Sequence, residues 1–126
     1  MNAAALPIIT DPTPSADWTP PTTDINGDPI PAGEITGYEI GIRDLAVTGS
    51  VAGTYPATVQ ATGATAITEA LTSFIASKAM VPGHSYAIAA MTLANTPPGN
   101  SQWGVEYQFT WQPLAAPMPP TALTVT

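Results

Sequence analysis

Strict alternation of apolar and polar residues recurs along the chain and predicts β-strands. In "WGVEYQFTW" (residues 103–111) every second residue is large and apolar, and Gly, Glu, Gln and Thr stand between them. This pattern is typical of a strand with one face in the core and the other in water. "ITGYEIGIR" (35–43) repeats it, and "HSYAIAAMTLA" (84–94) is apolar on both faces. Three long strands are therefore predicted.

Shorter strands are expected in "LPIIT" from residue 6, "SADWT" from 15, "GTYPATVQ" from 53 and "TSFIASKAM" from 72. Pro, Gly, Asn and Asp separate these stretches, as turns require. About seven short strands divided in this way favour an all-β fold, specifically a β-sandwich. In "ATAITEALTSFI" (64–75), Ala, Glu and Leu favour a helix whereas Thr and Ile favour a strand. A single helical turn at residues 66–72 and a strand are equal alternatives there.

The two ends of the chain resemble each other. "AAALPIIT" (3–10) and "PTALTVT" (120–126) are both short β-prone pieces next to proline. "QPLAAPMPP" (112–120) precedes the second copy and is typical of an extended, semi-rigid polyproline spacer. We therefore predict a body over residues 1–113 and a proline-rich C-terminal arm over residues 114–126.

Composition narrows the possible functions. The chain has 126 residues and no cysteine, so we expect one domain without disulfides or thiolate metal sites. Nine acidic residues against two basic ones give a net charge of −7, which argues against binding nucleic acid or an anionic membrane. No apolar run approaches the roughly 18 residues of a spanning helix. "MNAAALPIITDP" lacks a basic segment, so no secretory signal is expected.

Asp24, Asn26 and Asp28 have a spacing that suggests a calcium loop. An EF-hand loop needs Gly at its sixth position and Glu at its twelfth. Counted from Asp24, Gly27 is fourth and Ile35 is twelfth, so the spacing fails. "NGD" is a common turn sequence because Asn and Gly accept positive φ. The sequence predicts an ordinary turn, with no metal site and no cofactor.

Catalytic machinery is not expected either. His84 is the single histidine and follows "PG" at the start of a strand, which is an exposed position. No G-x-S-x-G motif surrounds a serine. The acids are scattered over turns and polar faces, where solvated carboxylates are the expected reading; they include Asp11, Asp17, Glu34, Glu39, Asp44, Glu69 and Glu106. The protein is predicted not to be an enzyme.

Two apolar surfaces have alternative readings. Trp103, Tyr107 and Trp111 share one face of the predicted last strand, where they either stack on sugar rings or fill the core. The core is favoured, with Trp103 and Trp111 protruding at the strand ends. The second face of residues 84–94 is flat and apolar and needs a cover. Either segment 44–73 or another subunit provides it; the face consists of Ala87, Ala89, Met91 and Leu93.

Four motifs in order resemble the fibronectin type III domain of bacterial and bacteriophage proteins over residues 5–112. They are "DWTPPTTDINGDPI", "ITGYEIGIR", "VPGHSYAIAAMT" and "PGNSQWGVEYQF". The resemblance implies an immunoglobulin-like β-sandwich in which Trp18 and Tyr38 anchor the core and Tyr86 forms the tyrosine corner. It also implies that the proline-rich stretch connects the second and third strands. Residues 44–73 depart from the family pattern, and "APMPPTALTVT" resembles the opening of a further such domain.

Two functions are compatible with these features. The first is a structural accessory protein of a bacteriophage virion, either a head decoration or a head or tail fibre protein. It would contact capsid or tail proteins and copies of itself, and neither nucleic acid nor membrane. Such domains normally act outside cells, and lysis would release one that starts at Met1 without a signal peptide. The second is an adhesive or carbohydrate-binding module of a bacterial surface or secreted protein, with a host-surface glycan as a candidate ligand.

Overall fold

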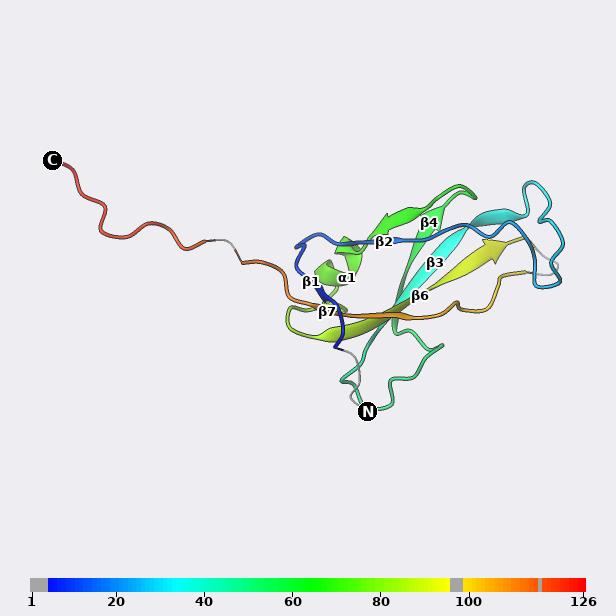
Figure 1. The fold of residues 1–126 in the computed structure, drawn as a ribbon, viewed down its shortest axis with the longest axis horizontal. Coiled ribbons are helices and arrows are strands. Elements are labelled where there is room, and N and C mark those ends of the chain that lie inside the picture. The colour runs from blue at the N-terminus through cyan, green and yellow to red at the C-terminus, as the bar shows by residue number, and fades with distance from the viewer. Residues whose placement is uncertain (1–4, 96–98, 116) are drawn as a thin grey trace.

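The computed structural model describes residues 5–95, 99–115 and 117–126 and consists mainly of β-strands (Figure 1). The all-β class predicted from the sequence is confirmed. The elements in chain order are β1 (Ile8–Ile9), β2 (Ser15–Asp17), β3 (Ile35–Asp44), β4 (Ala57–Thr62), β5 (Thr68–Ala70), α1 (Thr72–Ala76), β6 (Ser85–Ala94) and β7 (Tyr107–Trp111).

The strands form two sheets that share one core. A five-stranded sheet has the order β1-β7-β6-β3-β4, and a two-stranded sheet pairs β2 with β5. All pairs are antiparallel except β1 with β7, which is parallel. Both sheets and α1 contribute to a single cluster of buried residues: Ala16, Tyr38, Ile40, Ile42, Leu71, Phe74, Met80, Tyr86, Phe109 and Trp111.

The alternation in β3 decides which face of the large sheet is inside. Tyr38, Ile40 and Ile42 are buried on the inner face, so each is withdrawn from water as the pattern predicted. Tyr38 also donates a hydrogen bond from its hydroxyl to the carbonyl of Ala64, at 2.7 Å. Trp18 is half-buried and packs on Tyr38 with ring centroids 5.4 Å apart. Tyr38 is thus a core anchor, and Trp18 covers it from the edge.

The second residue of strand β6 is a tyrosine that binds the preceding loop. The hydroxyl of Tyr86 accepts a hydrogen bond from the Val81 N–H at 2.6 Å and donates to the Val81 carbonyl at 3.3 Å. The ring of Tyr86 is buried against Phe109. Because a buried N–H without a partner costs free energy, the hydroxyl ties the loop after α1 to the sheet.

The predicted strand over residues 72–80 is wrong. Residues Thr72–Ala76 are helical, and the helical turn predicted at 66–72 occurs later in the chain. Leu71, Phe74 and Ile75 have helical spacing and pack into the core, which favours a helix over a strand. Lys78 has a positive φ of 67° and ends the helix, with its N–H donating to the Ile75 carbonyl. Residues 68–70 form β5 instead.

The last strand is shorter than the predicted range 103–111 and begins at Tyr107. Tyr107 lies opposite Ile88, so a regular ladder would place residue 104 opposite residue 91. The N–H of Gly104 instead donates to the carbonyl of Ala90. One extra residue is therefore inserted, as in a β-bulge, and the alternation of faces is broken before Tyr107.

We predict that Tyr86→Phe destabilises the protein by about 1–3 kcal/mol, because the partly buried Val81 N–H loses its acceptor. Tyr107→Phe is the matched control, since Tyr107 is 52% exposed and no partner of its hydroxyl is found in the described residues. It should change the free energy of unfolding by less than about 0.5 kcal/mol. Chemical denaturation of both variants measures this. Equal losses would show that the bond to the loop contributes nothing.

Candidate functional site

The segment from Asp24 to Asp28, predicted to be an ordinary turn, is a closed turn. The Oδ1 atom of Asp24 accepts hydrogen bonds from the N–H groups of Asn26 and Asp28, at 2.8 and 3.0 Å. Gly27 has a φ of 84° and completes the turn, and Thr23 bridges Pro29. The Asp24 carboxylate is therefore used by its own backbone, as in an Asx turn. In the described residues no three His, Asp or Glu side chains are grouped to hold a metal ion.

His84 pairs with Asp44 at the start of β6. Its Nδ1 lies 2.7 Å from Oδ2 of Asp44, and its ring stacks on Tyr86. Burial raises the pKa of Asp44, but the hydrogen bonds from His84 and from the Ala46 N–H outweigh it and hold this pKa below its usual value. This pair orders the chain that leaves β3.

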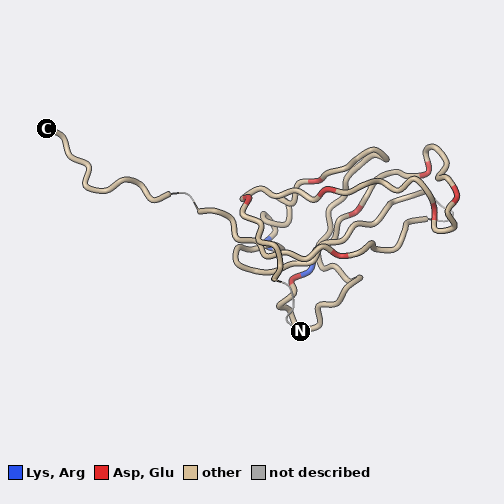
Figure 2. Tube along the Cα trace, in the orientation of Figure 1, with Lys and Arg blue, Asp and Glu red and all other residues tan. Residues whose placement is uncertain are grey.

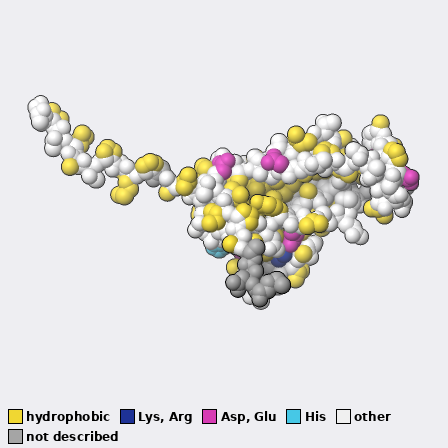
Figure 3. Space-filling model, in the orientation of Figure 1, with side chains coloured by type: hydrophobic (Ala, Val, Ile, Leu, Met, Phe, Trp, Pro, Cys, Tyr) yellow, Lys and Arg dark blue, Asp and Glu magenta, His cyan; other side chains and the backbone are white. Residues whose placement is uncertain are grey.

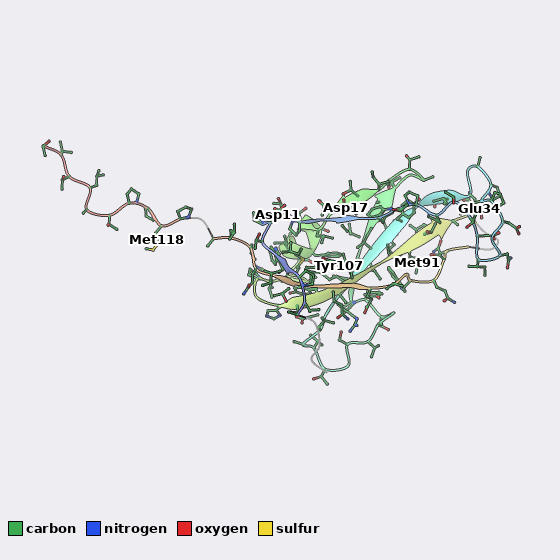
Figure 4. All side chains as sticks on the ribbon, viewed as in Figure 1. Asp11, Asp17, Glu34, Met91, Tyr107 and Met118 are labelled. Atoms are coloured by element: carbon green, nitrogen blue, oxygen red, sulfur yellow. The ribbon has the colours of Figure 1, made fainter. Side chains whose placement is uncertain are left out.

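The other acids named in the sequence analysis do not gather around the pair of His84 and Asp44. Figure 2 shows Asp and Glu spread over the body, and Figure 4 places Asp11, Asp17 and Glu34 at separate positions along it.

In the described part of the chain, no helix combines the length and apolarity needed to cross a membrane.

Glu106 is the exception among the predicted acids. It lies on the outer face of the five-stranded sheet and forms a two-pronged ion pair with Arg43. The Nε and Nη2 atoms of Arg43 donate to the two carboxylate oxygens, both at 2.7 Å. The two side chains are only 10% and 11% exposed. The expectation that Glu106 is solvated on a polar face is therefore wrong.

Tyr55 and Ser50 complete this group, which we call the outer-face cluster: Arg43, Glu106, Tyr55, Ser50 and Trp103. The Tyr55 hydroxyl donates to Glu106 at 2.8 Å, and Arg43 donates to Ser50 at 3.0 Å. The ring of Trp103 meets that of Tyr55 edge-on, with centroids 4.7 Å apart. Loop 45–56 is thereby fastened over the sheet.

Small residues make room for this cluster. A Cβ on Gly41 would lie 2.5 Å from the ring of Tyr55. Ala87 and Ala89, on the adjacent strand, are buried. The flat apolar face predicted on β6 is thus covered at this end by segment 44–73 of the same chain, which was one of the two alternatives. Met91 and Leu93, farther along β6, are half-buried.

Arg43 controls the ionisation of its partner. Its hydrogen bonds hold the pKa of Glu106 below the usual range against the opposing effect of burial, and the Tyr55 hydroxyl adds to the shift. A bidentate guanidinium–carboxylate pair of this kind is among the stronger charge-assisted contacts. Arg43 is one of only two Lys and Arg residues in the chain.

The predicted aromatic strip does not exist as one surface. Trp111 is buried, and its Nε1 donates to the Asp11 carbonyl at 2.9 Å, so the prediction that it protrudes is wrong. Trp103 packs on Tyr55 on the outer face, whereas Tyr107 stacks on Phe109. The register shift at Gly104 explains this separation, and the alternation in the sequence alone does not reveal it. The core reading holds for Trp111 only.

The C-terminal arm carries four strongly exposed apolar side chains. It leaves the end of β7 and points away from the body (Figure 1), and apolar groups occur along its length (Figure 3). Among the described residues, the last hydrogen bond between the arm and the body runs from the Leu114 N–H to the Thr10 carbonyl. Met118 stands clear of the body (Figure 4). Exposed fractions range from 73% to 96% for Leu114, Met118, Leu123 and Val125.

Comparison of the chain with protein-family models, with curated proteins and with solved structures gave no match.

We predict that Glu106→Gln costs about 3–5 kcal/mol at neutral pH, because it leaves the nearly buried Arg43 charge without a counter-ion. Since the pKa of Glu106 is lower in the folded state, its contribution is present above the unfolded value of about 4.3 and is lost as the pH falls through the folded value. The stability gap between wild type and variant should therefore shrink as the pH falls below about 5. Asp44 is present in both proteins, so its own titration cancels.

Denaturant unfolding across this pH range checks the prediction. Glu39→Gln is the control, because Glu39 lies on the same face of β3 and no ion pair of it is found among the described residues. This control should shift stability by less than about 0.5 kcal/mol. A Glu106→Gln gap that stays constant with pH would contradict the role assigned to the charge.

Proposed function

We propose that the body is a fibronectin type III-like β-sandwich. Three neighbouring strands, β7, β6 and β3, and a facing pair, β2 with β5, support this assignment, because that arrangement is shared by immunoglobulin-like sandwiches. The second support is Tyr86, whose hydroxyl bonds to the backbone five residues upstream at the entry to β6. A tyrosine corner has this geometry. The third support is the set of four sequence motifs that resemble the fibronectin type III domain.

We further propose that the protein is a non-enzymatic structural part of a larger assembly and that the arm attaches it. The observation that carries this proposal is the exposure of four large apolar side chains on a segment that leaves the body. Apolar surface of this kind is stabilised when a partner covers it. Proline at residues 113, 117, 119 and 120 stiffens the segment, so less entropy is lost on docking than for a flexible chain.

The proposed assembly is a bacteriophage virion, in which the protein is a head decoration or a head or tail fibre component. This part of the proposal rests on the resemblance of residues 5–112 to the bacterial and phage type of domain. The net charge of −7 supports partners that are proteins rather than nucleic acid. Fold likeness does not by itself fix function, so attachment to particles is the decisive measurement.

The carbohydrate-binding alternative depends on an aromatic platform. Trp103, Tyr107 and Trp111 do not provide one, because they point to different surroundings. No observation favours this alternative over protein contacts, and a glycan array serves as its test.

We predict that the protein copurifies with phage particles from a lysate of its natural host, as identified by mass spectrometry of gradient fractions. A variant that stops after Leu114 should lose attachment while its stability changes by less than about 0.5 kcal/mol, because no later hydrogen bond to the body is found in the described residues. Recovery with the cell envelope instead, or glycan binding without particle binding, would contradict the proposal.

Leu71→Ala is the complementary variant, which should lower stability without affecting attachment. Leu71 is buried in the core, so this change should cost about 2–5 kcal/mol through the cavity that it leaves. Below its melting temperature the variant should still attach. The pair of variants separates loss of attachment from loss of stability.

A further inference from the structure

The described residues leave one long sheet edge open. β4 has six residues and pairs with β3 on one side. The other edge strands are shorter, since β1 has two residues and β2 and β5 have three each. The pairing of β4 with β3 runs in one register, without a bulge. Proteins usually protect such an edge with a bulge, a proline or a lysine, and β4 has none of these.

The backbone groups on this edge can be assigned from the ladder. The Gly63 N–H donates to the Thr36 carbonyl, so alternate residues before Gly63 also face β3. Thr58, Gln60 and Thr62 therefore direct their N–H and carbonyl groups away from β3. Their side chains are exposed. The edge thus offers three donors and three acceptors in a row.

The arm contains a segment with a matching length and pattern. Residues 121–126, "TALTVT", form a six-residue β-prone stretch in which Leu123 and Val125 alternate with threonine or alanine. On the inner face of β4, Ala57 and Val59 are half-buried at the margin of the core. If residues 121–126 are added as a strand with Leu123 and Val125 on the inner face, these two side chains lie beside Ala57 and Val59. The threonines of the added strand on the opposite face then lie beside Thr58 and Gln60.

A groove extends the apolar row at the start of β4. It has a volume of about 330 Å³ and lies between loop 45–56 and the chain after α1. Val51, Pro56, Ala57 and Ala79 are among its lining residues. An apolar side chain arriving next to Ala57 has a place to be buried.

The charge distribution permits a second copy to supply the strand. The chain carries −7, so two bodies repel each other. Neither β4 nor residues 114–126 contain a charged residue, whereas β2 carries Asp17 and β5 carries Glu69. These two uncharged segments are therefore able to meet without opposing like charges. The arm of the same molecule points away from its own body (Figure 1).

We propose that residues 121–126 of one copy add as a strand to the open edge of β4 in another copy. The interface is head-to-tail, since an arm meets an edge rather than another arm, and it links copies into rings or chains unless two copies exchange arms. This inference rests on the proposed role of the arm as the attachment element, and it identifies a second copy as one of the partners.

The test is sedimentation of the full chain over about a hundredfold range of concentration, where mass action should raise the average mass above that of a monomer. Leu123→Pro removes a backbone donor from the arm and should leave the protein monomeric. Ala115→Pro is its control, because it adds a proline to a spacer that already has several, and should associate like the wild type. Both substitutions lie in the exposed arm and leave the body intact.

The edge is tested separately with Gln60→Pro. It removes an N–H that faces away from β3, a position where an edge strand tolerates proline, and the variant alone should be monomeric. Mixed with Leu123→Pro, it should form a one-to-one heterodimer, because one variant keeps the arm and the other keeps the edge. Far-UV circular dichroism and melting verify that Gln60→Pro is folded; if it is not, the arm variants alone decide.

A full chain that stays monomeric overturns the inference. So does association that survives Leu123→Pro, which would indicate contact between two edges or through another face, and so does a mixture of folded variants that stays monomeric. Particle binding distinguishes this failure from that of the proposed function. A monomeric protein that loses particle attachment when it stops after Leu114 would leave the attachment role standing and remove only the contact between copies.

Discussion

The ion pair between Arg43 and Glu106 holds together parts of the chain that are far apart in the sequence. Arg43 is on the central strand β3, Glu106 precedes β7, and Tyr55 and Ser50 come from the loop before β4. The inner face of the sheet is organised by apolar burial, which is not directional. The outer face is organised by charged hydrogen bonds, whose geometry fixes where loop 45–56 lies.

This arrangement explains residues that otherwise seem unsuited to a central strand. Glycine weakens a strand, yet Gly41 is required because Tyr55 lies directly over it. Ala87 and Ala89 lie opposite Arg43 and Gly41 and are buried, so small residues line the outer face below the cluster. The outer-face cluster therefore accounts for the small residues on this face. Both faces of the sheet are covered at the end where the cluster lies, whereas the edge formed by β4 is open.

The body and the arm differ in how they place their apolar residues. The body buries its aromatic and aliphatic residues around Tyr38 and Tyr86, and its acidic residues are spread over it (Figure 2). The arm is uncharged and apolar, and it is placed outside the body. A segment of this kind contributes little to folding and is available for intermolecular contact. The edge of β4, equally uncharged, is the complementary element on the body.

Much of the fold was predictable from the sequence because it depends on local patterns. The period-two alternation in β3 identified Tyr38, Ile40 and Ile42 as inward-facing, and turn chemistry identified the loop at Asp24. The helix at Thr72–Ala76 was misplaced because Thr and Ile obscure a spacing that only core packing selects.

Glu106 was missed for a different reason. A carboxylate on the polar side of an alternating strand is expected in water, and only the sheet order β7-β6-β3 and the loop carrying Tyr55 place it against Arg43 and away from water. The sequence by itself thus determined the class of fold and the inner face of the sheet, because both follow from interactions between near neighbours. The tertiary structure alone decided the ion pair, the cover of the outer face and which edge stays open, because these depend on residues up to 63 positions apart in the chain.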